Sequence, residues 1–252
     1  METAIHHDEA VIYKRASKFA MIIFLASEFM LFAALFATYI ILRTPDTLPF
    51  VAVIAIFFVG AMVILQKNNT LFTCLMTAGC VGAAVYILNH FVTLTPAWLG
   101  EEEALEFSKM LPTIIVNSFV LIASSFTYHA AEANVEKGKS PVLWLLGTIA
   151  LGSYFLLGQI KEWAHMKHEG MWFDTGNQFT SNFFATTGFH GFHVLVGIIL
   201  IAYVTVKALL GHYNKENHIS LQNIGFYWHF VDAIWLVVFS LYYGEHLHHL
   251  LK

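Results

Sequence analysis

The chain has 252 residues, of which 58% are hydrophobic and only 12% are charged. Soluble domains carry about 25% charged residues, so this composition excludes an ordinary soluble enzyme and predicts an integral membrane protein. The net charge of −4 is small and unclustered, so nothing points to nucleic-acid binding.

Long apolar segments separated by short polar connections predict an all-α, polytopic transmembrane bundle that forms a single domain over residues 1–252. The weakest candidate, 50–66, has the minimum length for spanning the hydrocarbon core. The longest polar connections are 94–111 and 162–181. The seven predicted spans are 19–42, 50–66, 71–93, 112–131, 142–161, 182–207 and 226–246.

Basic residues predict the orientation, because loops on the inner side of a membrane are enriched in lysine and arginine. An N-terminus inside and a C-terminus outside place eight basic residues on the inner side and five on the outer side. The inner set is Lys14, Arg15, Lys18, Lys67, Lys137, Lys139, Lys207 and Lys215, and the outer set is Arg43, Lys109, Lys161, Lys167 and Lys252.

Five ionisable residues lie inside the predicted spans. Glu28 is in FLASEFMLF, His190 and His193 are in GFHGFHVLVG, and His229 and Asp232 are in FYWHFVDAIW. Such residues cost about 2.5–3.5 kcal/mol each on insertion scales, so they usually face other helices and often mark a functional site. His190 and His193 are three residues apart and therefore share a helix face, as do His229 and Asp232.

Helix rise places Glu28 about 14 Å from one membrane surface and the two histidines about 12 and 16 Å from the other. We therefore expect that Glu28 can contact a histidine across two helices. The contact could be a packing hydrogen bond worth about 1 kcal/mol or part of a proton-exchange site. Packing is the favoured role. His229 and Asp232 are predicted to pair with each other, at most six residues below the inner surface.

Three further polar residues are secondary candidates: Asn117 in the fourth span, and Gln159 and Glu162 near the end of the fifth. We expect Gln159 and Glu162 to lie near water. Tyr227 and Trp228 are predicted to mark a membrane interface, where aromatic residues are enriched. The glycines from 147 to 158 predict a surface of close helix contact.

Fourteen histidines raise the alternative of a histidine-rich di-iron membrane oxygenase, because imidazole is the commonest metal ligand. The predicted topology separates these histidines between the two sides of the membrane, so we expect no metal centre in the chain. The inner set is His6, His7, His212 and His218, and the outer set is His165, His168, His246, His248 and His249. A proton-coupled transporter that uses Glu28 and Asp232 is the second alternative. It should have discontinuous helices or inverted repeats, which the sequence does not show.

Five motifs together resemble subunit III of the haem–copper terminal oxidases. They occur in the order of that family: FLASEF (24–29), LPTIIVNSFVLIASSFTYHAA (111–131), GQIKEW (158–163), FFATTGFHGFHVLVG (183–197) and FYWHFVDAIWLVVFSLYY (226–243). The resemblance covers about two thirds of the chain. Five helices match the family, and the hairpin at 47–95 is interpreted as an insertion that could replace the two leading helices of longer members.

The resemblance implies an accessory subunit that holds no haem or copper. Those cofactors would lie in the catalytic subunit of a complex that oxidises cytochrome c or quinol and reduces oxygen to water. The expected partners are subunits I and II, bound phospholipid and a larger respiratory supercomplex. The chain would stabilise the catalytic subunit and support proton uptake. The expected location is a bacterial or archaeal cytoplasmic membrane, or the mitochondrial inner membrane.

The resemblance also assigns residues. Glu28 matches the family's carbodiimide-reactive glutamate, and Asp232 matches its buried aspartate. His190, His193 and His229 match family histidines that serve as internal polar contacts.

Overall fold

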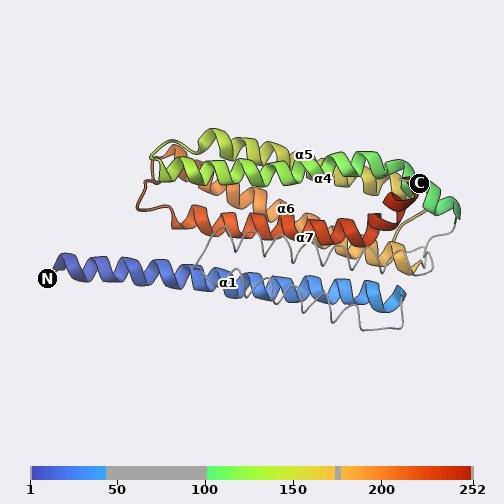
Figure 1. The fold of residues 1–252 in the computed structure, drawn as a ribbon, viewed down its shortest axis with the longest axis horizontal. Helices are drawn as coiled ribbons and strands as arrows, with labels where there is room; N and C mark the ends of the chain where they lie inside the picture. The colour runs from blue at the N-terminus through green and yellow to red at the C-terminus, as the bar shows by residue number, and fades with distance from the viewer. Residues whose placement is uncertain (1, 44–100, 174–176, 251–252) are drawn as a thin grey trace. The chain divides into compact units, whose positions relative to one another are not determined.

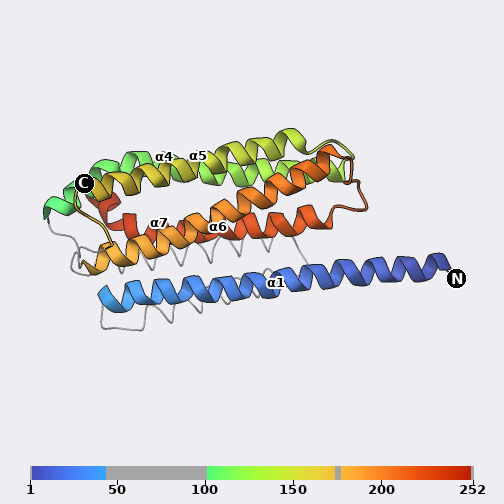
Figure 2. The same cartoon turned by 180° about the vertical axis from the view of Figure 1, so that it is seen from behind.

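The computed structural model describes residues 2–43, 101–173 and 177–250, and the regular elements in these ranges are all α-helices. The five helices are α1 (Glu2–Arg43), α4 (Glu101–Glu136), α5 (Val142–His168), α6 (Gln178–Leu209) and α7 (Ile219–Leu250). Figure 1 shows them from one side, and Figure 2 shows them from behind. The all-α class is confirmed. The predicted spans 50–66 and 71–93 lie outside the described residues, so the count of seven spans stays a prediction.

Each of the five helices contains a segment that is long and apolar enough to cross a membrane. These segments overlap the predicted spans at 19–42, 112–131, 142–161, 182–207 and 226–246, which are confirmed as helices. The observed segments are Val11–Leu42, Ala104–Glu136, Val142–His168, Gln178–Leu209 and Ile219–Gly244.

The helices are longer than the predicted spans. The stretch 101–111 belongs to α4 and the stretch 162–168 to α5, although both were predicted as parts of polar connections. Apolar composition marks the segment that crosses lipid, whereas the flanking Glu, Ala and Lys residues are good helix formers that continue the helix. Pro112 lies within α4. Membrane helices tolerate such interruptions because neighbouring groups satisfy the freed backbone.

Glycines in the left-handed conformation end three of the helices. Gly138, Gly170 and Gly211 have φ of 73°, 77° and 74°, and they follow α4, α5 and α6. At the end of α4, the amide of Lys139 donates to the carbonyl of Asn134 at 2.8 Å, which is the long hydrogen bond of a Schellman motif. The start of α6 is capped by the side chain of Asn177, which accepts from the amide of Phe179 at 2.8 Å.

The helices contribute to two compact units. The first unit contains residues up to Leu31, residues 114–161 and residues 189–233, and the second contains residues 32–113, 162–188 and 234–252. In each unit α7 is the helix that the others contact. It is also the most buried of the five helices: 61% of its most apolar window is buried, compared with 17% for α1.

In the first unit, the indole ring of Trp228 on α7 fills the space between two glycines. A Cβ on Gly152 of α5 would lie 2.8 Å from this ring, and one on Gly197 of α6 would lie 2.6 Å from it. The indole nitrogen donates to Ser124 Oγ of α4 at 3.0 Å. One side chain therefore fixes the spacing of four helices. This contact confirms the predicted packing role for Gly152.

In the second unit, tyrosines of α7 contact the other four helices. The Tyr242 hydroxyl bonds to Asn182 and Thr186 of α6, and the Tyr243 hydroxyl donates to Glu162 of α5 at 2.7 Å. The Tyr243 ring stacks on Phe107 of α4 at 5.3 Å. In the opposite direction, Tyr39 of α1 donates to the Leu241 carbonyl at 2.7 Å.

Gly197→Ala should destabilise the chain, because the added methyl group must push Trp228 aside. Overpacking of this kind typically costs about 1–3 kcal/mol. Thermal unfolding of the purified chain in mild detergent would measure the loss. Gly147→Ala is the matched control, because nothing lies within 4 Å of a Cβ at that position. Equal stability of the two variants would contradict the role given to Trp228.

Candidate functional site

The first unit contains a carboxyl–imidazole pair that joins two helices. Oε2 of Glu28, on α1, lies 2.9 Å from Nε2 of His193, on α6. The Glu28 side chain is 15% exposed and the His193 side chain 7%. The contact expected between Glu28 and a histidine is therefore present, and the histidine is His193.

A second hydrogen bond fixes the tautomer of His193. Nδ1 lies 2.7 Å from the backbone carbonyl of Phe189, and a carbonyl oxygen can only accept. Nδ1 must therefore carry a proton. If the imidazole is neutral, Nε2 has no proton and the bond to Glu28 requires a protonated carboxyl. If Nε2 is also protonated, an imidazolium faces a carboxylate. Either state keeps the pair neutral overall and places one proton between the two groups.

Aromatic rings surround this pair. Phe189, Phe192 and Tyr227 place their ring centroids 4.5, 5.8 and 6.4 Å from the imidazole of His193. The Tyr227 hydroxyl donates to the His193 carbonyl at 3.0 Å, and its ring stacks on Phe24 of α1 at 6.2 Å. These contacts hold the imidazole in one orientation and limit the access of water to the pair.

His190 is fully buried one helical turn from His193. Its ring meets the ring of Phe155 on α5 edge-on, with centroids 5.8 Å apart. The two histidines that share a face of α6 therefore contact different helices.

Asp232 pairs with α4. Its Oδ2 accepts a hydrogen bond from Ser125 Oγ at 2.6 Å, whereas the ring of His229 packs edge-on against Tyr128 at 6.1 Å. The predicted pairing between His229 and Asp232 is not observed. The predicted depth below the inner surface stays a prediction, and α7 begins at Ile219. The two residues lie ten and thirteen positions into its apolar segment.

The secondary candidates are buried. Asn117 of α4 donates to the Phe155 carbonyl at 2.9 Å, and its amide lies against Gly158 of α5, where a Cβ would be 2.6 Å from it. Gln159 and Glu162 are 1% and 7% exposed. These two side chains are therefore covered by other parts of the chain, as where Tyr243 of α7 donates to Glu162, and they do not lie at the end of α5, which continues to His168.

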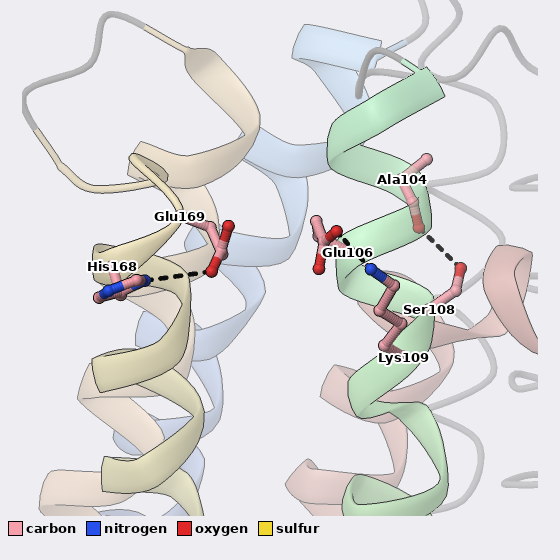
Figure 3. A network of polar contacts seen from close by, with 6 residues as sticks. All are labelled: Ala104, Glu106, Ser108, Lys109, His168 and Glu169. Atoms are coloured by element: carbon pink, nitrogen blue, oxygen red, sulfur yellow. Dashed lines mark hydrogen bonds and ion pairs between the residues drawn. The ribbon is translucent and has the colours of Figure 1, made fainter.

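The described residues contain no group of three or more His, Cys, Asp and Glu side chains that could hold a metal ion. At the end of α5, His168 is 85% exposed and its Nδ1 lies 3.1 Å from Glu169 (Figure 3). The same view shows Lys109 paired with Glu106 of α4, a separate local contact. The side chains of His6, His7, His246, His248 and His249 lie outside the described part of the chain.

Comparison with known proteins gives the family. The model of the family described as "Cytochrome c oxidase subunit III" matches residues 51–245. The chain belongs to the cytochrome c oxidase subunit III family. This family forms part of the haem–copper terminal oxidases, so the resemblance seen in the motifs is confirmed.

Individual relatives agree with the family match. A cytochrome c oxidase subunit 3 of Synechocystis sp. is 36% identical over 187 residues, which is 73% of each chain. A probable quinol oxidase subunit 3 of Staphylococcus saprophyticus is 35% identical over 53% of this chain and 67% of its own length. A cytochrome c oxidase subunit 3 of Papio hamadryas is 36% identical over 51% of this chain and 49% of its own.

The family match includes His190, His193, His229 and Asp232 and leaves out Glu28. It also includes most of the segment 47–95, so the interpretation of that segment as an insertion is not confirmed.

Sequence reasoning missed four contributors to the interhelical contacts described above. Ser125 gives no signal by itself, since a single serine in an apolar helix usually bonds its own backbone. The Phe189 carbonyl is a backbone group. Tyr227 and Trp228 were predicted at a membrane interface, and the structure buries them against α6 and α4, where they donate to the His193 carbonyl and to Ser124. The position of Tyr227 and Trp228 within the motif FYWHFVDAIWLVVFSLYY, which resembles the family, was the signal in the sequence that could have indicated their role.

Ser125→Ala should destabilise the chain, because it leaves Asp232 Oδ2 without its donor. The loss of a partner for a buried polar group costs about 1–3 kcal/mol. Ser27→Ala is the control, because the Ser27 hydroxyl bonds the carbonyl of Phe24 in its own helix and reaches no other helix among the described residues. Thermal unfolding in detergent would compare the two, and an equal effect would show that the contact with Asp232 contributes nothing.

Proposed function

We propose that the chain is the accessory, non-redox subunit of a proton-translocating haem–copper terminal oxidase. It stabilises the catalytic subunit, binds phospholipid and supports proton uptake toward the site where oxygen is reduced to water. Haem and copper belong to the partner subunits I and II. The observation that carries the proposal is the hydrogen-bonded pair of Glu28 and His193, which share one proton, in a chain of the subunit III family.

The pair can serve two roles at once. As a packing contact the pair holds α1 against α6. Among the described residues, few other polar contacts join α1 to another helix. As a proton site it can pass between its two neutral states without leaving an unpaired charge in the membrane. Sequence alone favours packing. The hydrogen bond from His193 Nδ1 to the Phe189 carbonyl supports a second role in proton exchange. It leaves Nε2 of the neutral imidazole as the atom that can accept a proton from Glu28.

Large apolar side chains on the outer faces of α1, α4, α5 and α6 support the roles in lipid binding and assembly. Phe19, Phe119, Leu143, Phe192 and Leu209 are all exposed. In a membrane such faces contact either acyl chains or the helices of other subunits.

The relatives support a complex without choosing its electron donor. Their names include both cytochrome c oxidase and quinol oxidase subunits. We place the chain in a bacterial or archaeal cytoplasmic membrane, or the mitochondrial inner membrane, with the N-terminus inside and the C-terminus outside. The proposal extends to a larger respiratory supercomplex that contains the oxidase.

No observation favours the two alternatives. The histidine pairs of the described residues do not converge as a di-iron oxygenase requires. Helices α1 and α4 to α7 each continue without a break, whereas a proton-coupled transporter is expected to bind its substrate at discontinuous helices.

Two substitutions at Glu28 separate packing from proton exchange. Glu28→Gln can still donate a hydrogen bond to His193 Nε2 but cannot release a proton. We therefore expect the complex to assemble normally and to pump fewer protons per electron in lipid vesicles. Glu28→Ala removes the carboxyl partner of Nε2, at a cost of about 1–3 kcal/mol, and should also weaken retention of the subunit during purification.

Normal pumping by an intact, lipid-replete Glu28→Gln complex would show that packing is the whole role of the pair. If the wild-type chain co-purifies with no haem-bearing subunit, the proposed function itself is wrong.

The orientation can be tested with single cysteines at two exposed loop positions, Ser140→Cys after α4 and Glu169→Cys after α5. A membrane-impermeant thiol reagent should label position 140 only from the inner side and position 169 only from the outer side. The chain for this test would also carry Cys74→Ser and Cys80→Ser. Labelling of both positions from one side, or with the sides exchanged, would refute the proposed topology.

A further inference from the structure

A line of ionisable side chains follows the contact between α4 and α7 in the first unit. Its members are Glu136, Glu132 and His129 of α4, and His229 and Asp232 of α7. Neighbouring members on the same helix are three or four residues apart, so they share a helix face at steps of about one turn. The line leads from the end of α4, where Glu136 is exposed, to Asp232, which is 9% exposed.

The Glu132 carboxyl lies between the two helices. Its Oε1 is so close to Gly225 of α7 that a Cβ added to this glycine would clash with it. Its Oε2 lies 3.9 Å from Nδ1 of His129, one turn further along α4. The charges of Lys18 on α1 and of Glu136 also act on the Glu132 carboxyl. An acid and an imidazole are therefore neighbours at the exposed end of the line.

His229 continues the line on α7. It interacts electrostatically with His129, and its ring packs edge-on against Tyr128 at 6.1 Å. Three residues later, Asp232 accepts a hydrogen bond from Ser125 through Oδ2 at 2.6 Å. Its other oxygen, Oδ1, is buried and has no hydrogen-bond partner in the described part of the chain. This oxygen is free to carry the proton of a neutral acid or to bind water.

The line of ionisable groups is open at one end only. Residues 110–127 of α4 and residues 233–241 of α7 contain no ionisable side chain. One turn beyond Ser125 on α4 lies Leu121, which is fully buried. The line therefore connects Asp232 with the end of α4 at Glu136, which is the inner side in the proposed topology, and it does not continue across the chain.

Acids and imidazoles alternate in a way that avoids net charge. Glu132 has His129 beside it, and Asp232 has His229 three residues away on the same face. When either acid passes its proton to the imidazole, a carboxylate and an imidazolium form together. Chains of Asp, Glu and His side chains of this kind relay protons in membrane proteins.

We propose that Asp232 is a proton-binding site, separate from the carboxyl–imidazole pair of α1 and α6, that exchanges its proton with one side of the membrane along the α4–α7 contact. Each step moves one proton from a donor to an acceptor, and water bridges the steps that are longer than a hydrogen bond. The groups in order are Asp232, His229, His129 and Glu132. In the complex this site can store a proton for uptake; that use rests on the proposed function, whereas the exchange itself does not.

Infrared spectroscopy during transfer into heavy water tests the exchange on the full chain in lipid bilayers. The C=O stretching band of a protonated carboxyl shifts when deuterium replaces its proton, and the band that Asp232→Asn removes belongs to Asp232. We expect this band to shift before the amide hydrogens of α7 exchange, because a relay does not require the helices to open. Mass spectrometry of α7 peptides measures the amide exchange. The absence of an Asp232 band, or a shift no faster than the amide exchange, would overturn the inference.

Two substitutions interrupt the line. His229→Phe keeps an aromatic ring against Tyr128 but cannot carry a proton. Glu132→Gln keeps the size of the side chain and also cannot carry a proton, so it serves as the test if His229→Phe does not fold. Each variant should slow the exchange of the Asp232 proton several-fold. A wild-type exchange rate in either folded variant would overturn the inference.

Matched controls remove the same chemical groups at the exposed end of α5. His168→Phe and Glu169→Gln alter a local pair that is separate from the α4–α7 contact (Figure 3). Both controls should exchange the Asp232 proton at the wild-type rate, and equal slowing in the controls would also overturn the inference. Failure of the wild-type chain to co-purify with a haem-bearing subunit would instead refute the proposed function, and it would not change the exchange expected for Asp232.

Discussion

Hydrocarbon cannot form hydrogen bonds, and this constraint determines how the helices of this chain pack. A polar atom inside the bilayer needs a partner on its own helix or on a neighbouring one. The tyrosines illustrate the constraint, because their hydroxyl groups reach across to backbone carbonyls that helices normally use internally. Tyr128 of α4 donates to the Leu221 carbonyl of α7 at 2.8 Å, and Tyr227 of α7 donates to the His193 carbonyl of α6. Aromatic bulk and one directional bond together fix the position of each neighbouring helix.

The pair of Glu28 and His193 satisfies the same constraint for two ionisable groups. Neither group is a costly isolated charge, because the pair is neutral in both of its protonation states. The direction of the bond from Nδ1 to the Phe189 carbonyl matters as much as the contact itself, since it decides which nitrogen faces the carboxyl. A backbone group with no chemistry of its own therefore selects the protonation states available to the site. Asp232 has no such basic partner among the described residues and is held by the Ser125 hydroxyl instead.

The sequence predicted the helical class, five of the spans and the contact between Glu28 and a histidine. These predictions depend on properties that act along one helix, namely hydropathy and rise per residue. Partners across helices were harder to predict, because they depend on how each helix is rotated about its axis. His229 and Asp232 share a face, yet Asp232 bonds α4. Gln159, Glu162, Tyr227 and Trp228 are buried for a related reason: hydropathy along the chain does not show which side chains a neighbouring helix covers.

The central place of α7 has a consequence for how the chain is made. This helix is synthesised after α1, α4, α5 and α6, yet it carries the partners of polar groups on those helices, including Ser124, Ser125, Tyr128, Asn182 and Thr186. Until α7 has left the ribosome and entered the bilayer, those groups have no α7 partner. The earlier helices can insert one by one, but they cannot reach their final packing before α7 arrives. A nascent chain stalled before Ile219 therefore lacks the α7 partners of these groups, a difference by which membrane proteases and chaperones can distinguish it from a chain that contains α7.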